Sequence, residues 1–584
     1  MKSKKLLISL GLAIVLAVAF ALPACNGEPE EYWYTPEGEK ILFEIDTIGG
    51  RSNDIGVMLV EDLQDFGLDV QQQVLDSGTF YQYLYEPNLG GMEAFVSSEG
   101  PSPDPWGDWI WMMLTDPENW GYLWNPTWYN DERYNELYID NFLAQNMSAK
   151  QEILFEMQEI LAEDLPVVFL IRDDFIAVHR TDNWGNWFNE MGGYVTWINE
   201  HSIREVTQLG DETQLRLGAL TSMDNLNMDQ NAMTYTHIGC LYLYLVYEAP
   251  IFYAKVDEDL SAAYDFVPKL ATGYSISHED DGEGGQNQVW TINLREGVKW
   301  HDYDTSGKNF TADDAVYSMK YVWDRWSVDR PINWTAVEAN DWEILPEHVL
   351  VTKTGDYQIQ WRFIEGWHQN EDFFVHSSWA NTRGVVPKHI FDAEGAPEDP
   401  MSWTGNYIGT GPYKVKEFVA DDYLLLERFD DYWGKDVPEV GLPEAEQVLF
   451  KVYTGSGPLF LALEAGEIDC TVGETAPFAK VDEYEANPDL EVDVVNDLGI
   501  YYLGFNLHPD MGYEPLQDVV LRQAIAQAID KQDIIDVALG GYGETADSWA
   551  YNESPNHKDD LPNSDYDPTA AETLLLDAGY TKHV

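Results

Sequence analysis

The sequence predicts a mixed α/β protein with two large lobes, and three observations support that prediction. The chain has 584 residues, and a single hydrophobic core stops growing at about 250 to 300 residues, so more than one core is expected. Hydrophobic residues make up 45% of the chain, which is typical of a globular protein rather than a disordered one. Near the start, a strand, a helix and a second strand follow one another as in a βαβ unit, which implies parallel pairing.

This βαβ pattern occupies residues 40–75. Residues 40–46, KILFEID, alternate between apolar and polar side chains, as a half-buried strand does. Residues 53–75 then predict a helix that stops near Gly67 and a second strand after it.

A second helix-to-strand unit is predicted at residues 148–171, where a capped helix runs into an apolar strand after Pro166. Residues 199–214 are polar, and a new strand begins at Leu215. The polar stretch is therefore the best candidate for an internal boundary. The rest of the chain mixes strands with amphipathic helices.

The first 25 residues have the pattern of an export signal. Lysines in the first five residues precede an apolar run from Leu6, and the run ends in the sequence LPAC at Cys25. This resembles a bacterial lipoprotein signal, in which the cysteine is lipidated after cleavage. The alternative is an uncleaved helical anchor. Both predict that the protein body lies outside the cytoplasmic membrane, and residues 26–39 then form a polar linker.

The charge balance excludes one class of function. The chain has 103 acidic and 33 basic residues, a net charge of -70, which repels nucleic acid and anionic membrane surfaces. We therefore expect no nucleic-acid partner. Such a balance suits a solvated extracytoplasmic protein, including one in a salty medium.

The three cysteines are Cys25, Cys240 and Cys470. With Cys25 lipidated, a disulfide between the other two is possible in an oxidising compartment. Two unrelated buried thiols are favoured, because Cys240 lies in an apolar run and Cys470 ends a helix-like stretch.

The motifs of enzyme and metal chemistry are missing. The sequence contains no nucleophile elbow, P-loop, zinc-protease motif or paired-cysteine motif, and its 12 histidines never cluster at metal-ligand spacing. Residues 278–285, HEDDGEGG, predict a solvated loop between strands. His301 is expected to be a structural histidine whose hydrogen bonds are satisfied within the protein. We predict no catalytic residue, no metal site and no cofactor. The rival class is an extracytoplasmic carbohydrate-binding protein or glycoside hydrolase with an aromatic cleft.

From residue 215 onward the motifs become specific. They include LRLGALTSMDNLN at 215–227, WTINLREGVKWHDYDTSGKNFTADDAVYS at 290–318, GTGPYKVKEF at 409–418 and YYLGFNLHPD at 501–510. In this order they resemble the family 5 solute-binding proteins of ABC importers, the oligopeptide, dipeptide and nickel group. The sequence departs from the family pattern at residues 303–305, where members of the family commonly have a glycine-containing turn.

The resemblance implies a two-lobed periplasmic-binding-protein-like fold of type II, in its large cluster C form, with a hinge between the lobes. It also implies a monomer that closes on a small peptide or peptide-like ligand and presents it to a membrane permease. Crossing strands between the lobes are expected near 163–179 and 491–507.

The order of segments departs from the family. In members of the family, the C-terminal segments resemble sequences that stand at the front of this chain. The helix over 568–578 is followed here by only a short stretch. The chain is interpreted as a circular permutant, rejoined through 199–214; the alternative is an error of gene assembly. The expected parts are a smaller lobe made of 40–165 and 493–584 and a larger lobe over 166–492.

The resemblance also implies candidate ligand contacts. In peptide-binding members an aspartate shortly before an aspartate-proline pair holds the peptide's α-ammonium group. Pro101 stands at that place here, and Glu99 is near enough to substitute, while Asp104 belongs to the pair itself. Aromatic faces and turns supply other pocket candidates, each of which could equally be core. They are Trp106, Trp109, Asn225, Leu226, Tyr253 and Trp379.

Overall fold

The computed structural model describes most of the chain from residue 31 onward. The predicted linker 26–39 is too long, because residues 32–34 form a strand and the Trp33 side chain is fully buried. The described residues are 31–85, 91–99, 113, 125–144, 147–189, 195, 199–220, 225–226, 237–248, 251–252, 267–280, 286–318, 349–363, 384–391, 393, 407–497, 499–562 and 565–583. Within these ranges, no helix combines the length and the apolar surface that crossing a membrane would require.

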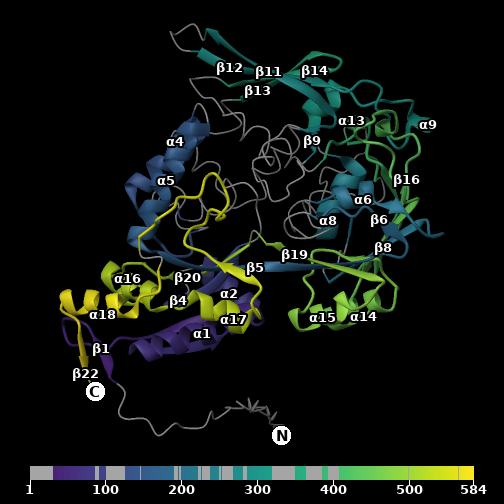
Figure 1. Ribbon diagram of the computed structural model, residues 1–584. Helices are drawn as coiled ribbons and strands as arrows, with labels where there is room; N and C mark the ends of the chain where they lie inside the picture. The colour runs from purple at the N-terminus through teal and green to yellow at the C-terminus, as the bar shows by residue number, and fades with distance from the viewer. Residues whose placement is uncertain are drawn as a thin grey trace, which may run out of the picture.

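One large mixed sheet organises the fold. Its strands follow the order β15-β16-β17-β8-β18-β5-β20-β4-β2-β3, and β19 and β21 also pair with β5. The long strand β5 runs across the middle of Figure 1 and connects the two halves of the molecule. The strands are β2 (Leu42–Thr47), β3 (Asp69–Val74), β4 (Ala94–Glu99), β5 (Val167–Arg180), β8 (Gln214–Ala219), β15 (Tyr413–Val419), β16 (Tyr423–Arg428), β17 (Gln447–Val452), β18 (Cys470–Thr471), β19 (Leu490–Asn496), β20 (Ile500–Phe505) and β21 (Gly543–Thr545).

The predicted βαβ unit is confirmed. Strands β2 and β3 pair in parallel, and helix α1 (Arg51–Phe66) connects them. Gly67 ends the helix with φ 104°, a left-handed conformation that glycine adopts without strain. The second predicted unit is also confirmed, since α5 (Met147–Asp164) leads into β5.

The predicted helix near the end of the sequence is α18 (Pro568–Asp577). The Asp567 side chain caps it by accepting from the Ala570 N–H, and proline occupies the first turn. Its apolar stripe packs through Leu575 into a core cluster that also contains side chains of α16 (Val519–Ala528). A surface helix of this kind is stabilised mainly by burial of that stripe.

The two ends of the described chain lie side by side (Figure 1). Strand β1 (Tyr32–Tyr34) pairs antiparallel with β22 (Thr581–His583), with Tyr32 opposite His583. The side chain of Trp33, the middle residue of β1, is fully buried and donates its indole N–H to the Phe66 carbonyl at 3.0 Å.

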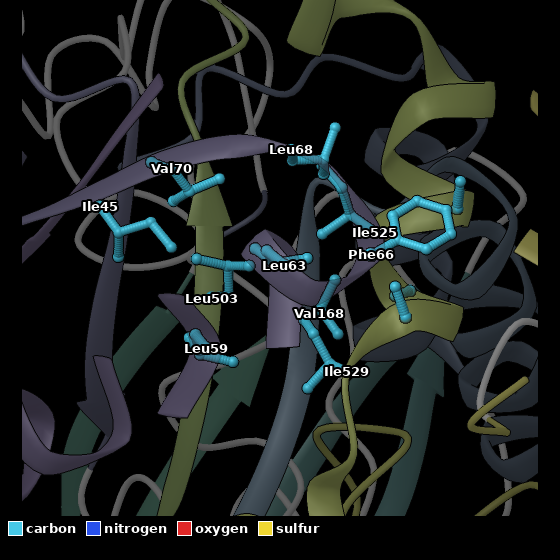
Figure 2. Packing of buried hydrophobic residues seen from close by; sticks show 14 of the residues in the cluster. Ile45, Leu59, Leu63, Phe66, Leu68, Val70, Val168, Leu503, Ile525 and Ile529 are labelled. Atoms are coloured by element: carbon cyan, nitrogen blue, oxygen red, sulfur yellow. The ribbon is translucent and has the colours of Figure 1, made fainter. Parts of the chain in front are cut away.

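The same core cluster joins the early and late parts of the chain. Figure 2 shows Leu59 and Leu63 of α1 packed among Val168 of β5, Leu503 of β20 and Ile525 of α16. These residues are buried, so neither end of the chain forms this core alone.

The hydrophobic interior divides along β5. Up to Ile171 the apolar side chains of β5 belong to two clusters shared with residues 33–170 and 500–580. From Phe175 onward they belong to clusters built within residues 175–490. The segments predicted to cross between the halves are strands β5, β19 and β20, and β19 and β20 both pair with β5.

The second half carries a separate antiparallel sheet of order β11-β12-β14-β13. Strands β11 (Ala271–Asp280) and β12 (Gln286–Leu294) are neighbours. The loop predicted at 278–285 is shorter than expected, because residues 278–280 belong to β11 and pair with residues 286–288. Residues 281–285 lie outside the described residues. The other two strands are β13 (Val349–Gly355) and β14 (Gln358–Phe363).

A tight packing contact explains the glycines of the sequence GTGPY at 409–413. They lie on the π-helical turn Leu243–Tyr247, where a Cβ built on Gly409 would come 1.8 Å from the Val246 carbonyl oxygen. The Gly411 N–H donates to that carbonyl at 2.9 Å. His301 is a satisfied structural histidine, as predicted: it accepts from the Gly409 N–H at 3.2 Å and its Nε2 lies 2.9 Å from the Gly411 carbonyl.

The remaining described elements complete the two halves. They are α2 (Ser77–Tyr85), α4 (Glu132–Leu143), β6 (Trp184–Gly185), α6 (His201–Glu205), β7 (Thr207–Gln208), α8 (His237–Tyr242), β9 (Ile251–Phe252), β10 (Val267–Pro268), α9 (Tyr303–Ser306), α13 (Lys388–Phe391), α14 (Ser456–Glu464), α15 (Val481–Glu485) and α17 (Lys531–Ala538), with short 3-10 turns at Trp433–Asp436, Phe478–Lys480 and Glu514–Gln517.

The polar stretch 199–214 differs from the expectation of a simple exposed boundary. Residues 199–204 are buried, whereas residues 211–213 are exposed and the Leu209 side chain is 61% exposed. The physical reason is that Glu200 and Arg204 form ion pairs inside the protein. The exposed residues of this stretch are 208, 209 and 211–213, and Gly210 is partly buried.

Candidate functional site

The carboxyl ends of strands β2 and β4 lie where β5 leaves the first half. Strands β2 and β4 are parallel, and β20 is antiparallel to both β4 and β5, so β2, β4 and β5 all run the same way. Helix α1 begins at this edge with Arg51, and β4 ends there with Glu99. In open α/β sheets, ligands bind outside the carboxyl ends of the strands. This edge is the candidate functional site.

Charged groups gather at the point of crossing. The Arg51 guanidinium forms an ion pair with the Asp173 carboxylate of β5. The Asp497 N–H, in the turn between β19 and β20, donates to the Asp173 carbonyl at 3.0 Å. The Asp497 carboxylate in turn accepts from the Gly499 N–H at 3.1 Å. The site thus ties α1 to both crossing segments.

Arg172 is the buried cation of the site, with only 2% of its surface exposed. It donates through Nη2 to the Trp549 carbonyl at 2.8 Å and to the Ser548 carbonyl at 3.2 Å. Burial lowers the pKa of Arg172 to about 10, because the charged form loses its hydration, although the Glu544 carboxylate opposes that shift.

Carboxyl groups outnumber guanidinium groups here. Burial raises the pKa of Asp174 and of Asp497, and it raises the pKa of Glu544 to about 7. Desolvation disfavours the charged form of each carboxyl group. The crossing therefore carries groups that bind protons more readily than exposed carboxylates do.

A pH dependence of stability follows from the raised pKa values. Burial raises the pKa to about 6 for Asp46 and Asp62 and to about 7 for Glu474 and Glu544. Their stabilising contribution is complete below the unfolded pKa near 4 and is lost as the pH rises through 6 to 7. We expect a higher melting temperature at pH 5.5 than at pH 8.0 at constant ionic strength, measured by calorimetry.

The matched control for this pH effect is the double variant Glu474→Gln and Glu544→Gln, which removes two of the four groups. It should flatten the pH dependence between 5.5 and 8.0. An equal dependence in the variant and the parent protein would contradict the assignment.

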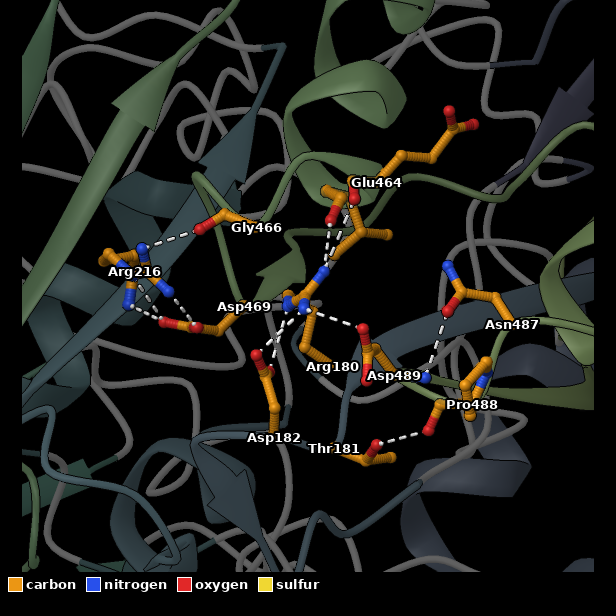
Figure 3. Close-up of polar contacts among 11 residues, drawn as sticks. Arg180, Thr181, Asp182, Arg216, Glu464, Gly466, Asp469, Asn487, Pro488 and Asp489 are labelled. Atoms are coloured by element: carbon orange, nitrogen blue, oxygen red, sulfur yellow. Dashed lines mark hydrogen bonds and ion pairs between the residues drawn. The ribbon is translucent and has the colours of Figure 1, made fainter.

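The far end of β5 is fixed by a second set of ion pairs, shown in Figure 3. Arg180 lies 2.9 Å from Asp182 and donates to the Leu463 carbonyl at 3.2 Å. On strand β8, which is separated from β5 by β18, the Arg216 guanidinium forms two hydrogen bonds to the buried Asp469 carboxylate, at 2.6 and 3.1 Å. Because both ends of β5 are held, a change of angle between the halves falls on its middle residues.

The structure describes three of the predicted ligand contacts. Glu99 ends β4, where its backbone pairs with Ile500 next to the crossing turn. Leu226 is 2% exposed in the core of the second half, and its carbonyl accepts from the Tyr242 hydroxyl at 3.3 Å. The neighbouring Asn225 is partly buried.

Six other residues that were predicted to have a role lie outside the described residues. These are Asp104, Trp106, Trp109, Tyr253, Trp379 and the lipidation residue Cys25. Cys470 is a free, buried thiol, and burial raises its pKa. Cys240 lies on α8. No disulfide to Cys470 is present.

Sequence reasoning missed Arg51, Arg172, Asp173 and Asp497. One signal was available, because the strand VVFLIRDDFIAVHR places three consecutive charged residues inside a long apolar run. Among the residues that the structure describes, no group of three or more His, Cys, Asp or Glu side chains is placed to hold a metal ion.

The chain is a mixed α/β protein with a hydrophobic core on each side of a few crossing strands. Comparison with known protein families identifies the family of this chain. Residues 265–584 match the bacterial extracellular solute-binding proteins, family 5, middle region. This match covers more than half of the chain, and the chain belongs to that family, whose members are extracytoplasmic binding proteins and not enzymes.

Individual relatives are more distant. The chain is 26% identical over 339 residues to the dipeptide-binding protein of Escherichia coli K12, covering 56% of this chain and 58% of the relative. It is also 26% identical over 339 residues to the oligopeptide-binding protein AppA of Bacillus subtilis 168, covering 56% and 53%. The chain thus spans little more than half the length of these relatives.

Among solved structures, the substrate-binding protein CtaP of Listeria monocytogenes aligns with a TM-score of 0.44 and 24% identity. The alignment covers 63% of this chain and 66% of that one.

Proposed function

We propose that this protein is the solute-binding component of an ABC importer. It closes two lobes on a peptide or peptide-like ligand and presents the closed form to a membrane permease. The observation that carries the proposal is family membership, and the division of the interior along β5 supports a hinge. Closure needs no chemistry, because a ligand that contacts both lobes favours the closed state by its differential affinity.

The two proposed lobes follow the division of the interior. The bounds expected from the sequence are 40–165 and 493–584 for the smaller lobe and 166–492 for the larger lobe. The core clusters extend the smaller lobe to Trp33 and to Ile171. Because Val168 and Ile171 pack in the smaller lobe's core, we draw the hinge in β5 at residues 172–174.

The proposed ligand site is the carboxyl edge of the smaller lobe's sheet. Glu99 ends β4 at that edge and is our candidate acceptor for a ligand ammonium group. Aromatic faces, carried by Trp106, Trp109, Tyr253 and Trp379, would supply stacking surface, and Asp104, Asn225 and Leu226 complete the proposed contact set.

Thermal shift with panels of peptides and sugars tests the proposal. A bound ligand raises stability by RT ln(1 + [L]/Kd) and is recovered unchanged. Mass spectrometry of ligand retained by the purified protein identifies the class. Stabilisation by sugars alone would favour a carbohydrate-binding protein, and consumption of a sugar would favour a glycoside hydrolase; either result contradicts the peptide proposal.

For a peptide that binds, Glu99→Gln should weaken affinity by about 10- to 100-fold, because a hydrogen bond to a charged group is worth about 1.5 to 3 kcal/mol. The matched control is the same peptide with an acetylated amino end. It should bind the parent protein and the variant equally, and a Glu99→Gln loss that persists with the acetylated peptide would exclude Glu99 as the ammonium acceptor.

We also propose that the segment order is a circular permutation of the family order. The antiparallel pairing of β1 with β22 supports it, because Tyr32 stands opposite His583 and a two-residue turn would join them as a hairpin. Residues 209–213 are the proposed junction, since exposed loops tolerate new ends.

A rearranged chain tests this order directly. It begins at Asp211, runs to His583, continues through an Asn-Gly turn into Tyr32 and ends at Gly210. We expect it to fold with a circular dichroism spectrum and melting temperature close to those of the parent protein. The control carries its new ends between Ile203 and Arg204, in a buried helix, and should be strongly destabilised. Failure of both chains would contradict the permutation.

The proposed location is the outer face of the cytoplasmic membrane, with Cys25 lipidated and the residues between Cys25 and β1 as the linker. Metabolic labelling with a fatty acid should mark the parent protein and not Cys25→Ser. Labelling of both would indicate attachment elsewhere. We propose that the protein acts as a monomer, with the permease as its partner and no nucleic-acid partner.

A further inference from the structure

The segment after β21, residues 546–558, has neither helix nor strand, yet side chains from other elements hold its backbone. Lys531 of α17 donates to the Ala546 carbonyl at 2.7 Å. Arg172 of β5 donates to the Trp549 carbonyl, and Gln158 of α5 donates to the Asn556 carbonyl at 2.8 Å. A segment held at its start, middle and end is built to keep one conformation.

The side chains that hold this segment are themselves buried. Arg172 is 2% exposed, Gln158 is 1% exposed and Lys531 is 8% exposed. Burial of polar and charged groups is costly unless their hydrogen bonds are satisfied, and here carbonyls of the segment accept several of those bonds. Gln158 also accepts from the Ser548 hydroxyl at 2.7 Å and from the Lys558 N–H at 3.2 Å.

Tyr551 carries the contact to the other side of the crossing. Its hydroxyl accepts a hydrogen bond from the Asn496 side chain, and Asn496 is the last residue of β19. Leu490 and Val492 of that strand pack against the second half. The Tyr551 ring lies 5.7 Å from the Arg172 guanidinium. One side chain, Arg172, therefore holds the backbone before Tyr551 and also contacts its ring.

We propose that residues 546–558 form a strap that braces the crossing strands, with Arg172 as its positioning residue and Tyr551 as its contact to β19. The inference rests on the proposed closure of two lobes. A fixed strap at the hinge restricts the conformations of the lobes before ligand binds, and restriction to the conformations that bind ligand increases affinity. The strap is thus expected to contribute to ligand affinity although it lies beside the hinge.

Tyr551→Phe is the sharpest test, because it keeps the ring beside Arg172 and removes only the hydroxyl. That hydroxyl bonds to Asn496 across the crossing and to Glu553 within the strap itself. Hydrogen exchange of residues 490–500 should become faster, while residues 546–550 keep their protection. Affinity for a peptide from the binding panel should fall about fivefold, the effect of one hydrogen bond. The control Lys558→Met removes the partly exposed ion pair between Lys558 of the strap and Glu159 of α5, and it should change neither readout.

Arg172 is tested by two variants. Arg172→Met should release residues 546–551 to faster exchange and lower the melting temperature. Arg172→Lys keeps the charge but not the forked donor geometry, and should give an intermediate effect. If Arg172→Met does not fold, Arg172→Lys and Tyr551→Phe still decide the question.

Unchanged exchange of residues 490–500 in Tyr551→Phe, or unchanged exchange of residues 546–551 in Arg172→Lys, would overturn the strap. Because exchange is measured without ligand, it separates the two proposals. If no panel ligand binds but exchange changes as expected, the proposed ligand class fails and the strap stands.

Discussion

Replacing Trp33 with alanine should lower the free energy of unfolding of the smaller lobe by about 3 to 5 kcal/mol, the usual cost of removing a fully buried tryptophan. The side chain is 0% exposed, donates to the Phe66 carbonyl and lies under the Lys582 ammonium group, 5.4 Å from its ring. Its loss removes packing from both chain ends at once. The melting transition of that lobe should move down accordingly.

Urea unfolding measures the free energy, and hydrogen exchange locates the effect. Exchange should accelerate in residues 568–583, which are adjacent to Trp33 only in the folded protein. Tyr34→Ala is the control, because Tyr34 lies in the same strand, is only partly buried and stacks on His583 at 4.0 Å. If Trp33→Ala leaves residues 568–583 unchanged, the chain ends do not stabilise each other.

Replacing Lys269 with methionine should be similarly costly, by about 3 to 5 kcal/mol, because it breaks a buried ion network. Lys269 is fully buried and lies 2.9 Å from the Glu200 carboxylate, which also accepts from Arg204 at 2.6 Å. Arg204 donates to the Tyr432 hydroxyl at 3.0 Å, and that hydroxyl donates to Glu248 at 2.8 Å. Without Lys269, two buried carboxylates share one guanidinium.

The charge state of this network explains the expected loss. Burial by itself would raise the pKa of Glu200, but Arg204 and Lys269 outweigh burial and hold that pKa at about 2. Methionine is nearly the same length and fills the space, so the loss measures charge rather than a cavity.

The measurement is urea unfolding at pH 7 of the larger lobe. The control is Lys353→Met, which removes an exposed ion pair to Asp313 at 2.8 Å and should cost less than about 1 kcal/mol. Equal, small losses in the two variants would mean that the buried pair contributes no more than a surface pair.

Much of the fold was predictable because it depends on local pattern. The alternation at 40–46, the glycine at position 67 and the Asp-Pro start of the last helix each act within one turn of chain. The crossing strands were expected only from the family resemblance, since an apolar run does not reveal its partner. The motifs after residue 215 identified the family.

The candidate site was less predictable. Glu99 was proposed from the position of a motif, and the structure adds that its strand ends beside the crossing turn. Arg172 was not predicted to be part of the site, because its partners are the backbone carbonyls of residues 548 and 549. The pattern of side chains in a sequence does not predict such backbone partners. The buried Glu200 and Arg204 were interpreted as part of a polar boundary. A charged residue in the sequence can be exposed to water or buried in an ion pair, and its polarity alone does not distinguish the two.

By itself, the sequence determined the α/β class, the position of its regular elements and the family, and its net charge predicts that there is no nucleic-acid partner. Periodicity, capping, composition and net charge are properties of the chain before it folds. Only the tertiary structure decided that Tyr32 pairs with His583, that the interior divides at residues 172–174 and that Tyr551 reaches Asn496. Each of these contacts joins segments far apart in sequence. Their partners are selected by packing of the whole chain, which local patterns do not encode.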